Sequence, residues 1–555
     1  MELRVERRWL WLALALGALS GVAALVIGLL RPLTIQDDAR QFIFWMAEWR
    51  DEDTFRGDLI ADYWRSVSPW LYVAVFRVAD FLGLDPLNTA RLLPAFLFPA
   101  TAYFAYRFSE AIFRDARLAY LATLFLLMWL VSDDGVVSAT PRAFAPLFLL
   151  VFLDGLARRS TIKVTIGLVC LAGTYPQGAM VAVAVLGIIF IDLAGRPRLV
   201  LSRANFLLFA AGAAAALAGV APFLLDSSQF GPVVTPESAR QFATFGSGGR
   251  TSFFGPDGRI EFACHSRIGI FPKLPGCNGW TSPTFWLAMF AVLLPPSLVF
   301  AHYRKTRGQS GSPIPVAIVL ASFVWFAIAA ILAFRLHLPN RFVIRTIPLV
   351  SVLCLGFVVG AFFQSRLKPG STGERLAQVV GGGILIAIFA ALLVTQHLRN
   401  FHNWKRPALA EAVASYPVGS VFAGFVDDTD NIPVFTQRRV LFSVELAVAY
   451  HLGYYRQIEA RMRDMVVAEL TPDAAMLAEL LERNAVDVYL VEERHLAEPY
   501  SDKKVRNLLG GFVDAQRAQF AGAPTALSRL APACSRGVFD KVVVLDAHCL
   551  IAAAR

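Results

Sequence analysis

Charged residues are scarce in this chain: they make up 17% of its 555 residues, whereas apolar residues make up 56% and the mean hydropathy is +0.54. Soluble domains carry about 25% charged residues, so this shortage of charge excludes an ordinary soluble protein. Apolar stretches close to the roughly 20 residues that cross a bilayer recur from Trp9 to about His397 and then stop. The sequence therefore predicts a transmembrane domain over 1–398 and a soluble domain over 399–555.

The net charge of +10 could suggest a nucleic-acid partner, but the positions of the basic residues do not support one. Most lysines and arginines lie in short loops between apolar segments, which is the bias that orients membrane proteins, so we expect no nucleic-acid partner. Arg4, Arg7 and Arg8 precede the first apolar stretch and place the N-terminus in the cytoplasm. That stretch is longer than the apolar part of a signal peptide, and no clear A-x-A cleavage site follows it, so we expect an uncleaved anchor.

About 11 transmembrane helices are predicted, because eleven apolar segments alternate so that nearly every basic cluster falls inside. They cover residues 9–30, 88–108, 118–131, 143–156, 162–175, 179–193, 205–225, 282–303, 314–335, 342–363 and 379–397. The stretch Pro69–Leu82 is too short to cross easily, and counting it would turn the basic clusters outward, so it predicts a juxtamembrane helix. Eleven spans place the C-terminal domain outside, in the periplasm of a bacterial inner (plasma) membrane.

Two long outer loops, 31–87 and 226–281, follow from this topology. The first loop is rich in acids and also holds a run of aromatic residues with helical spacing. That run predicts an amphipathic helix lying in the membrane interface. Its aromatic residues are Phe42, Phe44, Trp45 and Trp49.

The C-terminal domain mixes strand and helix patterns. Apolar runs at 486–491 and 541–545 predict strands, and amphipathic stretches near 444–469 and 473–484 predict helices. The predicted fold class is therefore an α-helical polytopic membrane protein with a C-terminal α/β extracytoplasmic domain. The acidic run Asp427–Asn431 lacks the glycine and distal glutamate of an EF-hand and predicts a solvated loop. We expect this domain to bind the acceptor or cap the membrane site.

Cysteines are few, and their positions agree with the topology. Cys264 and Cys277 share the second outer loop, while Cys534 and Cys549 share the C-terminal domain. Pairs in an oxidising compartment can form disulfides, so two bridges are a hypothesis. The remaining cysteines, Cys170 and Cys354, lie in apolar segments, where a lone cysteine is usually a packing residue.

Two adjacent aspartates, Asp37 and Asp38, lie a few residues beyond the first apolar segment. Carboxylates are costly at a membrane boundary, so a pair placed there is a candidate functional site. The alternative is that one of them caps the helix that follows, because aspartate is a favoured N-cap. Asp38 lies nearer that helix, which favours Asp37 as the chemically active member.

Other polar groups fall on the same outer side: Asp133, Asp134, Arg142, His265, His337, Arg341 and Arg345. Arginines bind phosphate, and a carboxylate can take the proton of an acceptor hydroxyl. This combination suits a lipid-phosphate-linked sugar. The acceptor hydroxyl would attack the anomeric carbon while arginines stabilise the departing phosphate.

Structural interpretations stay open for these groups. Asp133-Asp134-Gly135 fits a turn, and Arg142 fits an interface anchor. Arg341 and Arg345 lie four residues apart on a predicted helix, which suits joint phosphate contact as well as anchoring. Histidines are more often hydrogen-bonded structural residues than catalysts. No metal-ligand spacing stands out, although the paired aspartates could hold Mg²⁺ or Mn²⁺.

With its parts in this order, the chain resembles the GT-C superfamily of integral-membrane glycosyltransferases, and in architecture its bacterial PMT/ArnT-like members. The resemblance implies an inverting transfer from a polyprenyl-phosphate sugar donor to a glycan, lipid, cell-envelope polymer or protein acceptor on the extracytoplasmic face. It implies Asp37 or Asp38 as the catalytic base and Asp133 or Asp134 as a second acid. The segment Leu336–Phe342 is similar to the late-loop segment near the lipid phosphate, with His337 where an aromatic residue is more usual.

Two other classes compete with an enzyme. Transporters place their charges at the membrane midplane and show internal repeats, whereas here the acids fall in outer loops and no repeat relates the two halves. A non-catalytic glycan-binding or assembly protein of the same architecture stays open. The absence of a W-W-D motif weakens the case for transfer to asparagine.

Overall fold

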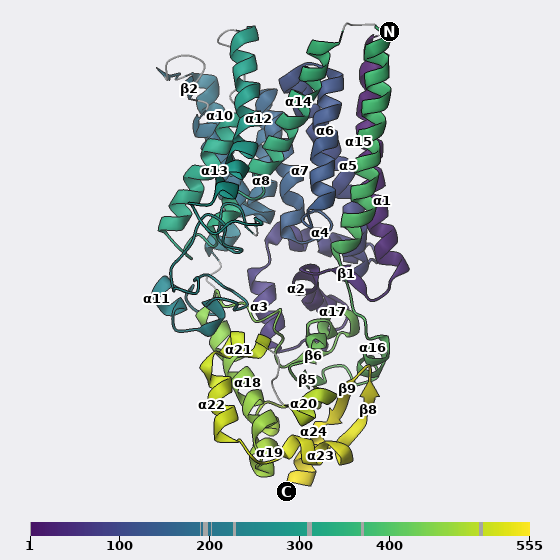
Figure 1. Cartoon of the computed structure of the whole chain (residues 1–555), viewed down its shortest axis with the longest axis vertical. Coiled ribbons are helices and arrows are strands. Elements are labelled where there is room, and N and C mark those ends of the chain that lie inside the picture. The colour runs from purple at the N-terminus through teal and green to yellow at the C-terminus, as the bar shows by residue number, and fades with distance from the viewer. Residues whose placement is uncertain are drawn as a thin grey trace.

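The computed structural model describes residues 2–188, 190–192, 198–200, 202–225, 229–272, 274–307, 314–367, 371–498 and 503–555. Residues 189 and 193, in the sixth expected segment, and residues 226–228 and 273, in the second outer loop, lie outside the described residues. Figure 1 shows a layer of long helices that begins at the N-terminus, and a mixed domain at the opposite end that holds the C-terminus.

A helix forms at each of the eleven expected segments. The helices are α1 (Glu2–Leu30), α5 (Pro86–Phe113), α6 (Ala116–Ser132), α7 (Ala145–Ala157), α8 (Thr161–Thr174), α9 (Pro176–Ile188), α10 (Arg203–Leu225), α12 (Pro283–Arg307), α13 (Ile314–Ile331), α14 (Ile347–Arg366) and α15 (Thr372–Arg399). Six of them, α1, α10 and α12 to α15, are long and apolar enough to cross a membrane by length and composition. The chain is an α-helical multi-pass membrane protein, and for the other five helices crossing stays a prediction.

Close packing of α1 on α5 depends on small residues. Gly17 and Gly21 are four residues apart and face α5, and a Cβ at Gly21 would lie 2.6 Å from the Cα of Ala95. Small residues at this spacing let two membrane helices approach backbone to backbone. The hairpin of β2 (Ile191–Asp192) and β3 (Arg198–Leu199) lies at the same end of the layer as the N-terminus (Figure 1).

The first outer loop folds into β1 (Thr34–Gln36), α2 (Ala39–Ile43), α3 (Leu59–Val67) and α4 (Trp70–Phe81). The short helix expected over Pro69–Leu82 is α4, which packs against α5 and α8.

The aromatic run forms a 3-10 helix over Phe44–Trp49, and Phe44 and Trp45 are only 3% and 2% exposed. The prediction of an interfacial amphipathic helix is therefore wrong: Phe44 packs edge-on against Phe55, and helix α17 (Ile432–Thr436) of the C-terminal domain contacts this helix.

The C-terminal domain is built on a five-stranded sheet with the order β6-β5-β7-β9-β8. Its strands are β5 (Val421–Ala423), β6 (Arg439–Val440), β7 (Val488–Glu492), β8 (Ser535–Phe539) and β9 (Val542–Asp546). β5 pairs in parallel with β6 and β7, whereas β9 pairs antiparallel with β7 and β8. The two predicted strands are β7 and β9, so the apolar runs were correctly assigned.

Helices surround this sheet: α16 (Pro407–Ala414), α17, α18 (Leu452–Leu470), α19 (Ala474–Arg483), α20 (Glu493–Ala497), α21 (Lys503–Leu509), α22 (Gly511–Gln519), α23 (Ala526–Cys534) and α24 (Ala547–Ala554). The expected helix near 444–469 begins only at Leu452. The preceding residues form an irregular segment that faces the membrane domain.

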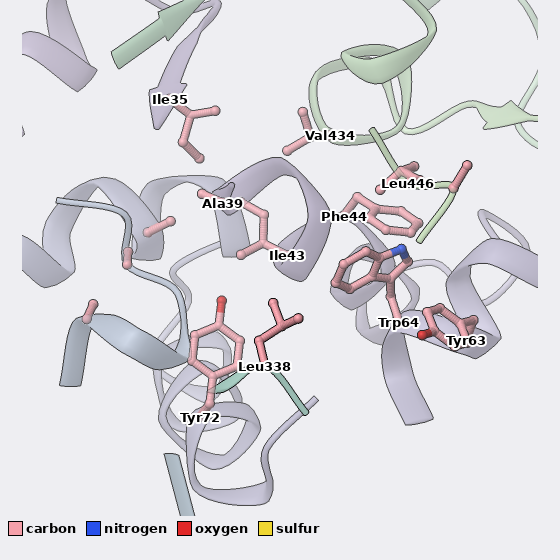
Figure 2. Close-up of a cluster of buried hydrophobic side chains, with 14 of the residues drawn as sticks. Ile35, Ala39, Ile43, Phe44, Tyr63, Trp64, Tyr72, Leu338, Val434 and Leu446 are labelled. Carbon is pink, nitrogen blue, oxygen red and sulfur yellow. The ribbon is translucent and has the colours of Figure 1, made fainter. Parts of the chain in front are cut away.

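The two domains are joined through the first outer loop. β1 pairs antiparallel with β4 (Phe401–Asn403), which comes directly after α15. Figure 2 shows the buried cluster beside this pairing, where Ile43 of the first loop, Leu338 of the late loop and Leu446 of the C-terminal domain come together. Burial of each such side chain contributes about 1.5–3 kcal/mol, so the cluster fixes the three segments relative to one another.

Both hypothesised disulfides are present. Cys264 and Cys277 are bonded with their Cα atoms 6.0 Å apart, and Cys534 and Cys549 with theirs 5.5 Å apart. The first bond closes a loop of the second outer segment, where α11 (Pro236–Ala239) also lies. Cys170 and Cys354 are free.

Candidate active site

A cavity of about 1380 Å³ lies between the helical layer and the C-terminal domain. All eight residues that the sequence nominated for catalysis or substrate binding line it: Asp37, Asp38, Asp133, Asp134, Arg142, His337, Arg341 and Arg345. They come from three segments far apart in the sequence, namely the first outer loop, the loop after α6 and the loop before α14. Their chemical roles stay predictions, but the structure places them around one space.

The aspartate pair follows strand β1 and begins helix α2. Asp38 occupies the N-cap position, yet its side chain makes no capping hydrogen bond. It points to Arg142 instead, with the Nη1 atom of Arg142 2.6 Å from its Oδ2 atom. Asp37 is paired with Arg40 and is 53% exposed. The capping interpretation of Asp38 is thus not supported, and the ground for preferring Asp37 as the base falls away.

An alternating chain of charges links the three segments. Arg142 also pairs with Asp134 through its Nη2 atom at 2.8 Å. Arg345, 6% exposed, pairs with Asp133 and lies 3.7 Å from Asp134. Asp133 also accepts a hydrogen bond from the N–H of Gly135 at 2.9 Å, so the predicted turn and the charged site are one structure.

The pKa values of Asp38 and Asp133 reflect these partners. Burial alone would raise the pKa of Asp38, but nearby positive charges lower it below its ordinary value. Those charges belong to Arg142, Arg341, Arg250 and Arg267. For Asp133, burial again raises the pKa, but Arg345 and Arg142 outweigh it and lower the pKa. Both carboxylates are therefore ionised at neutral pH.

Arg341 and Arg345 do not share a helix face, because α14 begins only at Ile347 with Pro348 in its first turn. Arg341 lies in the 3-10 helix Pro339–Phe342, and its carbonyl accepts a hydrogen bond from the Tyr175 hydroxyl at 3.0 Å. The expected shared helix face is therefore wrong. Arg345 binds the acids, and Arg341 faces the cavity without a carboxylate partner among the described residues.

Glu445 of the C-terminal domain also lines the cavity, although the sequence did not nominate it. Its Oε1 atom accepts hydrogen bonds from Arg250 and Gln41. Burial raises the pKa of Glu445 to about 7, even though the charge of Arg250 lowers it. No sequence motif marks this residue, since its position depends on contacts that span some 200 to 400 positions of the chain.

The acidic run 427–431 positions Glu445. Asp430 accepts hydrogen bonds from the Ser443 hydroxyl at 2.6 Å and from the N–H of Glu445 at 3.1 Å, and Asn431 accepts one from Arg40 at 2.7 Å. The prediction of a solvated loop is wrong, because buried carboxylates here are satisfied by such partners. Asp428, 5% exposed, accepts from the indole of Trp404 at 2.6 Å.

The two candidate histidines differ in position. His337 lines the cavity and lies 4.9 Å from Tyr450 between ring centres. Burial, with the charges of Arg341, His451 and Arg267, lowers the pKa of His337 to about 3, so it is neutral. His265 is held within its loop by the Ser252 hydroxyl at 3.4 Å. The structural interpretation therefore fits His265.

Three carboxylates could hold a cation: Asp37, Asp38 and Glu445 each offer an oxygen atom, and these atoms lie within 4.8 Å of one another. Oxygen ligands fit Mg²⁺ or Mn²⁺. Each carboxylate is already paired with an arginine, so a cation there would compete with those pairs.

One arm of the cavity is apolar. It lies beside α12, α13 and the start of α14 and is lined by residues of the disulfide-closed loop, described over 264–272 and 274–277, which we call the bridged loop. Its lining side chains include Ile270, Phe271, Leu274, Val292, Phe323 and Ile344. The cavity thus joins a charged end to an apolar end, as an amphiphilic ligand requires.

No protein-family model matches the chain, and no curated protein matches its sequence. Among solved structures, the crystal structure of the Archaeoglobus fulgidus oligosaccharyltransferase tethered with an acceptor peptide is similar over 92% of this chain and 72% of that chain, with 11% identity and a TM-score of 0.49. The mycobacterial arabinofuranosyltransferase AftD is similar over 88% of this chain, with 16% identity and a TM-score of 0.49. This chain covers 36% of the length of AftD.

Proposed function

We propose that the chain is an integral-membrane glycosyltransferase of the GT-C type. It transfers a sugar from a polyprenyl-phosphate donor to a hydroxyl of a glycan, lipid, cell-envelope polymer or protein. The observation that carries this proposal is the shape and charge of one cavity. Ionised aspartates and arginines face each other at its polar end, and its apolar arm lies among membrane helices.

The polar end supplies the groups for an inverting transfer. Asp38 takes the proton of the acceptor hydroxyl, whose oxygen forms a bond to the anomeric carbon. The bond from that carbon to the phosphate oxygen breaks, and its electron pair leaves on the phosphate. Arginine charges stabilise this developing anion. Both aspartates are paired with an arginine, and we assign the base to Asp38 because its side chain is the less exposed of the two, at 30% against 53%, and lies among the charges of the cavity arginines.

The remaining acids have supporting roles. Asp133 and Asp134 hold Arg345 and Arg142, so they position the base indirectly. Asp37, Asp38 and Glu445 would hold a divalent cation, which would add positive charge beside the substrate. Mn²⁺ bound there would show by its spin-resonance signal, and chelation followed by addition of Mg²⁺ or Mn²⁺ tests whether transfer needs it.

The orientation follows the positive-inside bias. The cavity and the C-terminal domain lie on the outer face of a bacterial inner membrane, and the N-terminus lies in the cytoplasm. The lipid donor reaches the apolar arm from the bilayer, and the acceptor enters from the side of the C-terminal domain.

The test uses the purified full chain in nanodiscs with radiolabelled polyprenyl-phosphate sugars and a panel of acceptors. The wild type should transfer the label, and Asp37→Asn with Asp38→Asn together should reduce the rate by about 10²- to 10⁴-fold. Glu52→Gln is the matched control, because Glu52 lies in the same loop with its side chain 86% exposed. Full activity of the double variant would exclude the assigned base. If the chain is instead reconstituted into closed vesicles, uptake of the label without transfer would favour a transporter.

A further inference from the structure

The two candidate aspartates lie in a short turn, residues 36–41, which we call the aspartate turn. Helix α2, which begins in this turn, has only five residues and receives no capping hydrogen bond from the side chain of Asp38. Such a short helix is not stable by itself, because its nucleation is costly and its stability comes from tertiary contacts. The direction in which the assigned base points therefore depends on side chains that hold the turn in place.

One buried guanidinium group makes several of these contacts. Arg40 is 5% exposed, and each of its side-chain nitrogen atoms donates a hydrogen bond. The Nε atom donates to the carbonyl of Asp37 at 3.1 Å, and the Nη2 atom binds the Asp37 carboxylate. The Nη1 atom donates to the Oδ1 atom of Asn431 at 2.7 Å. Arg40 thus ties the aspartate turn to the C-terminal domain, across a sequence separation of 391.

The hydrogen bond to the carbonyl of Asp37 acts on the base through the backbone. That carbonyl belongs to the peptide group that joins Asp37 to Asp38, and a peptide group is planar. Fixing its plane therefore limits the directions in which the Asp38 side chain can leave the backbone. In the structure this side chain reaches Arg142, with 2.6 Å between the Oδ2 and Nη1 atoms.

The C-terminal domain provides a firm support for this contact. Asn431 is 4% exposed and occupies the N-cap position of helix α17, which contacts α2. Figure 2 shows Val434 of α17 beside the buried Ala39 of α2. A second contact lies next to the first, because the side-chain amide of Gln41 donates a hydrogen bond to Glu445.

The chemistry of the contact suits the setting of an orientation. Asn431 is neutral, so it adds no charge, and its carbonyl oxygen accepts hydrogen bonds best near its lone-pair directions. The planar fork of an arginine can bind a backbone carbonyl, a carboxylate and an amide oxygen at the same time. A lysine would offer a single ammonium group without this fixed geometry.

We propose that Arg40 is a positioning residue of the transfer reaction and that Asn431 makes the C-terminal domain part of the catalytic unit. This inference rests on the proposed glycosyl transfer. Arg40 is not among the described residues that line the cavity, so it acts through the aspartate turn and not on the substrate. Its loss should slow the step in which Asp38 takes the proton, because a displacement of about 1 Å can cost about 100-fold in rate.

Transfer by the purified full chain in nanodiscs tests this role. Arg40→Ala should lower kcat by about 10- to 100-fold and leave the KM for the polyprenyl-phosphate donor within about twofold of the wild type. Asn431→Ala, which keeps the contacts between Arg40 and Asp37, should lower kcat by a smaller factor. The two losses should not multiply in the double variant, because both remove the same hydrogen bond. Arg56→Ala is the matched control, since Arg56 lies in the same loop with its side chain 68% exposed.

Chemical rescue separates positioning from folding. Arg40→Ala leaves a space of the size and shape of a guanidinium group, so guanidinium ion at a concentration that does not unfold the protein should restore part of kcat. The ion should not stimulate Arg56→Ala. Arg40→Lys keeps the charge without the fork and should stay less active than the wild type.

Hydrogen exchange gives a readout that does not depend on activity. The backbone amides of the aspartate turn should exchange faster in Arg40→Ala and in Asn431→Ala than in the wild type, while the amides of helix α5 stay protected. Unchanged exchange of the turn in both variants would overturn the positioning role. Faster exchange throughout the chain would indicate general unfolding and would overturn it as well.

The transfer assay distinguishes the two proposals. Wild-type protein that transfers no sugar would overturn the proposed function, and the role of Arg40 in it would fall too. Wild-type protein that transfers, with Arg40→Ala as active as Arg56→Ala, would overturn the positioning role alone. A wild-type kcat in Asn431→Ala would remove the C-terminal domain from the catalytic unit.

Discussion

At the scale of single residues, Glu445 connects the C-terminal domain to the arginines of the cavity. It pairs with Arg250, and the carbonyl of Arg250 accepts a hydrogen bond from Arg267. The charge state of one carboxyl group therefore affects two arginines. Because burial raises the pKa of Glu445 to about 7, this charge changes within the physiological range.

We expect the transfer rate to rise with pH through about 7 as Glu445 ionises and fixes Arg250. Glu445→Gln mimics the protonated acid at every pH, so its rate at pH 8 should resemble the wild-type rate at pH 6. The pH profile of kcat/KM measures this, and Glu492→Gln, elsewhere in the same domain, should keep the wild-type profile. A rising limb that persists in Glu445→Gln would assign it to another group.

The stability of the folded chain should also depend on the ionisation of Glu445, but it should fall, rather than rise, as the pH increases. The folded-state pKa of Glu445, about 7, lies above its ordinary value of 4.5, so between these values the folded chain binds more protons than the unfolded chain. The contribution of Glu445 to stability is therefore present below pH 4.5 and is lost as the pH rises through 7.

Gly135 is the position in the acid-bearing loop where a side chain cannot fit. An added Cβ would contact the guanidinium of Arg345 and lie 2.7 Å from the Oδ2 atom of Asp133. Gly135→Ala should force this ion pair apart, with a loss of about 1–3 kcal/mol of stability and a lower transfer rate. Thermal melting and transfer assays measure both. At Gly187 a Cβ would have no neighbour within 4 Å, so Gly187→Ala should change neither.

At the scale of elements, the bridged loop is a short segment with two functions. It covers the apolar arm with Phe271 and Leu274, and it presents Arg267 to the charged end. The disulfide between Cys264 and Cys277 joins its ends across a sequence separation of 13. Closing a loop of about 15 residues lowers the entropy of the unfolded chain by an amount worth about 3 kcal/mol, so the bond favours the folded form of the loop over its unfolded forms.

Replacing both cysteines of the bridged loop by serine should therefore weaken binding of the polyprenyl monophosphate by about tenfold or more. The same replacement of Cys534 and Cys549 is the matched control, since that bond joins residues separated by 15 at the far end of the C-terminal domain. It should lower thermal stability but leave lipid binding intact. Equal loss of binding in both double variants would indicate general unfolding.

The elements also show what the sequence could and could not predict. A long apolar run signals a membrane helix by itself, because a helix satisfies its own backbone hydrogen bonds. A helix formed at each of the eleven segments, and six of these helices are long and apolar enough to cross a membrane. The separation of Arg341 from Arg345 had a signal that was overlooked: Pro348 suits the first turn of a helix, which puts Arg345 before its start.

No local pattern in the sequence marks the pairing of β1 with β4 or the position of Glu445 at the cavity. Both join segments about 370 to 400 residues apart, and neither the three-residue strands nor a lone glutamate has a distinctive local pattern. The position of Asp37, Asp38 and the loop acids at one cavity could be anticipated for a different reason, and their chemical roles stay predictions. Charges at membrane boundaries are costly, so their positions alone were informative.

At the scale of the whole molecule, Figure 1 places the N-terminus and the C-terminal domain at opposite ends of the helical layer. The predicted eleven membrane crossings would account for this, because an odd number puts the two ends on opposite faces, and the cavity lies on the side of the C-terminal domain. The proposed reaction requires this side to be extracytoplasmic. Sidedness can be measured with single cysteines at exposed positions, because the two ends offer suitable residues.

Val538 of the C-terminal domain is 52% exposed, and Leu199 of the hairpin at the opposite end is 72% exposed. In intact cells, a membrane-impermeant maleimide should label Val538→Cys and leave Leu199→Cys unlabelled, each judged against the parent protein. After the membrane is permeabilised, both should react. The reverse pattern would put the acids and arginines of the cavity on the cytoplasmic face, where the positive-inside bias and the formation of two disulfides would both be violated.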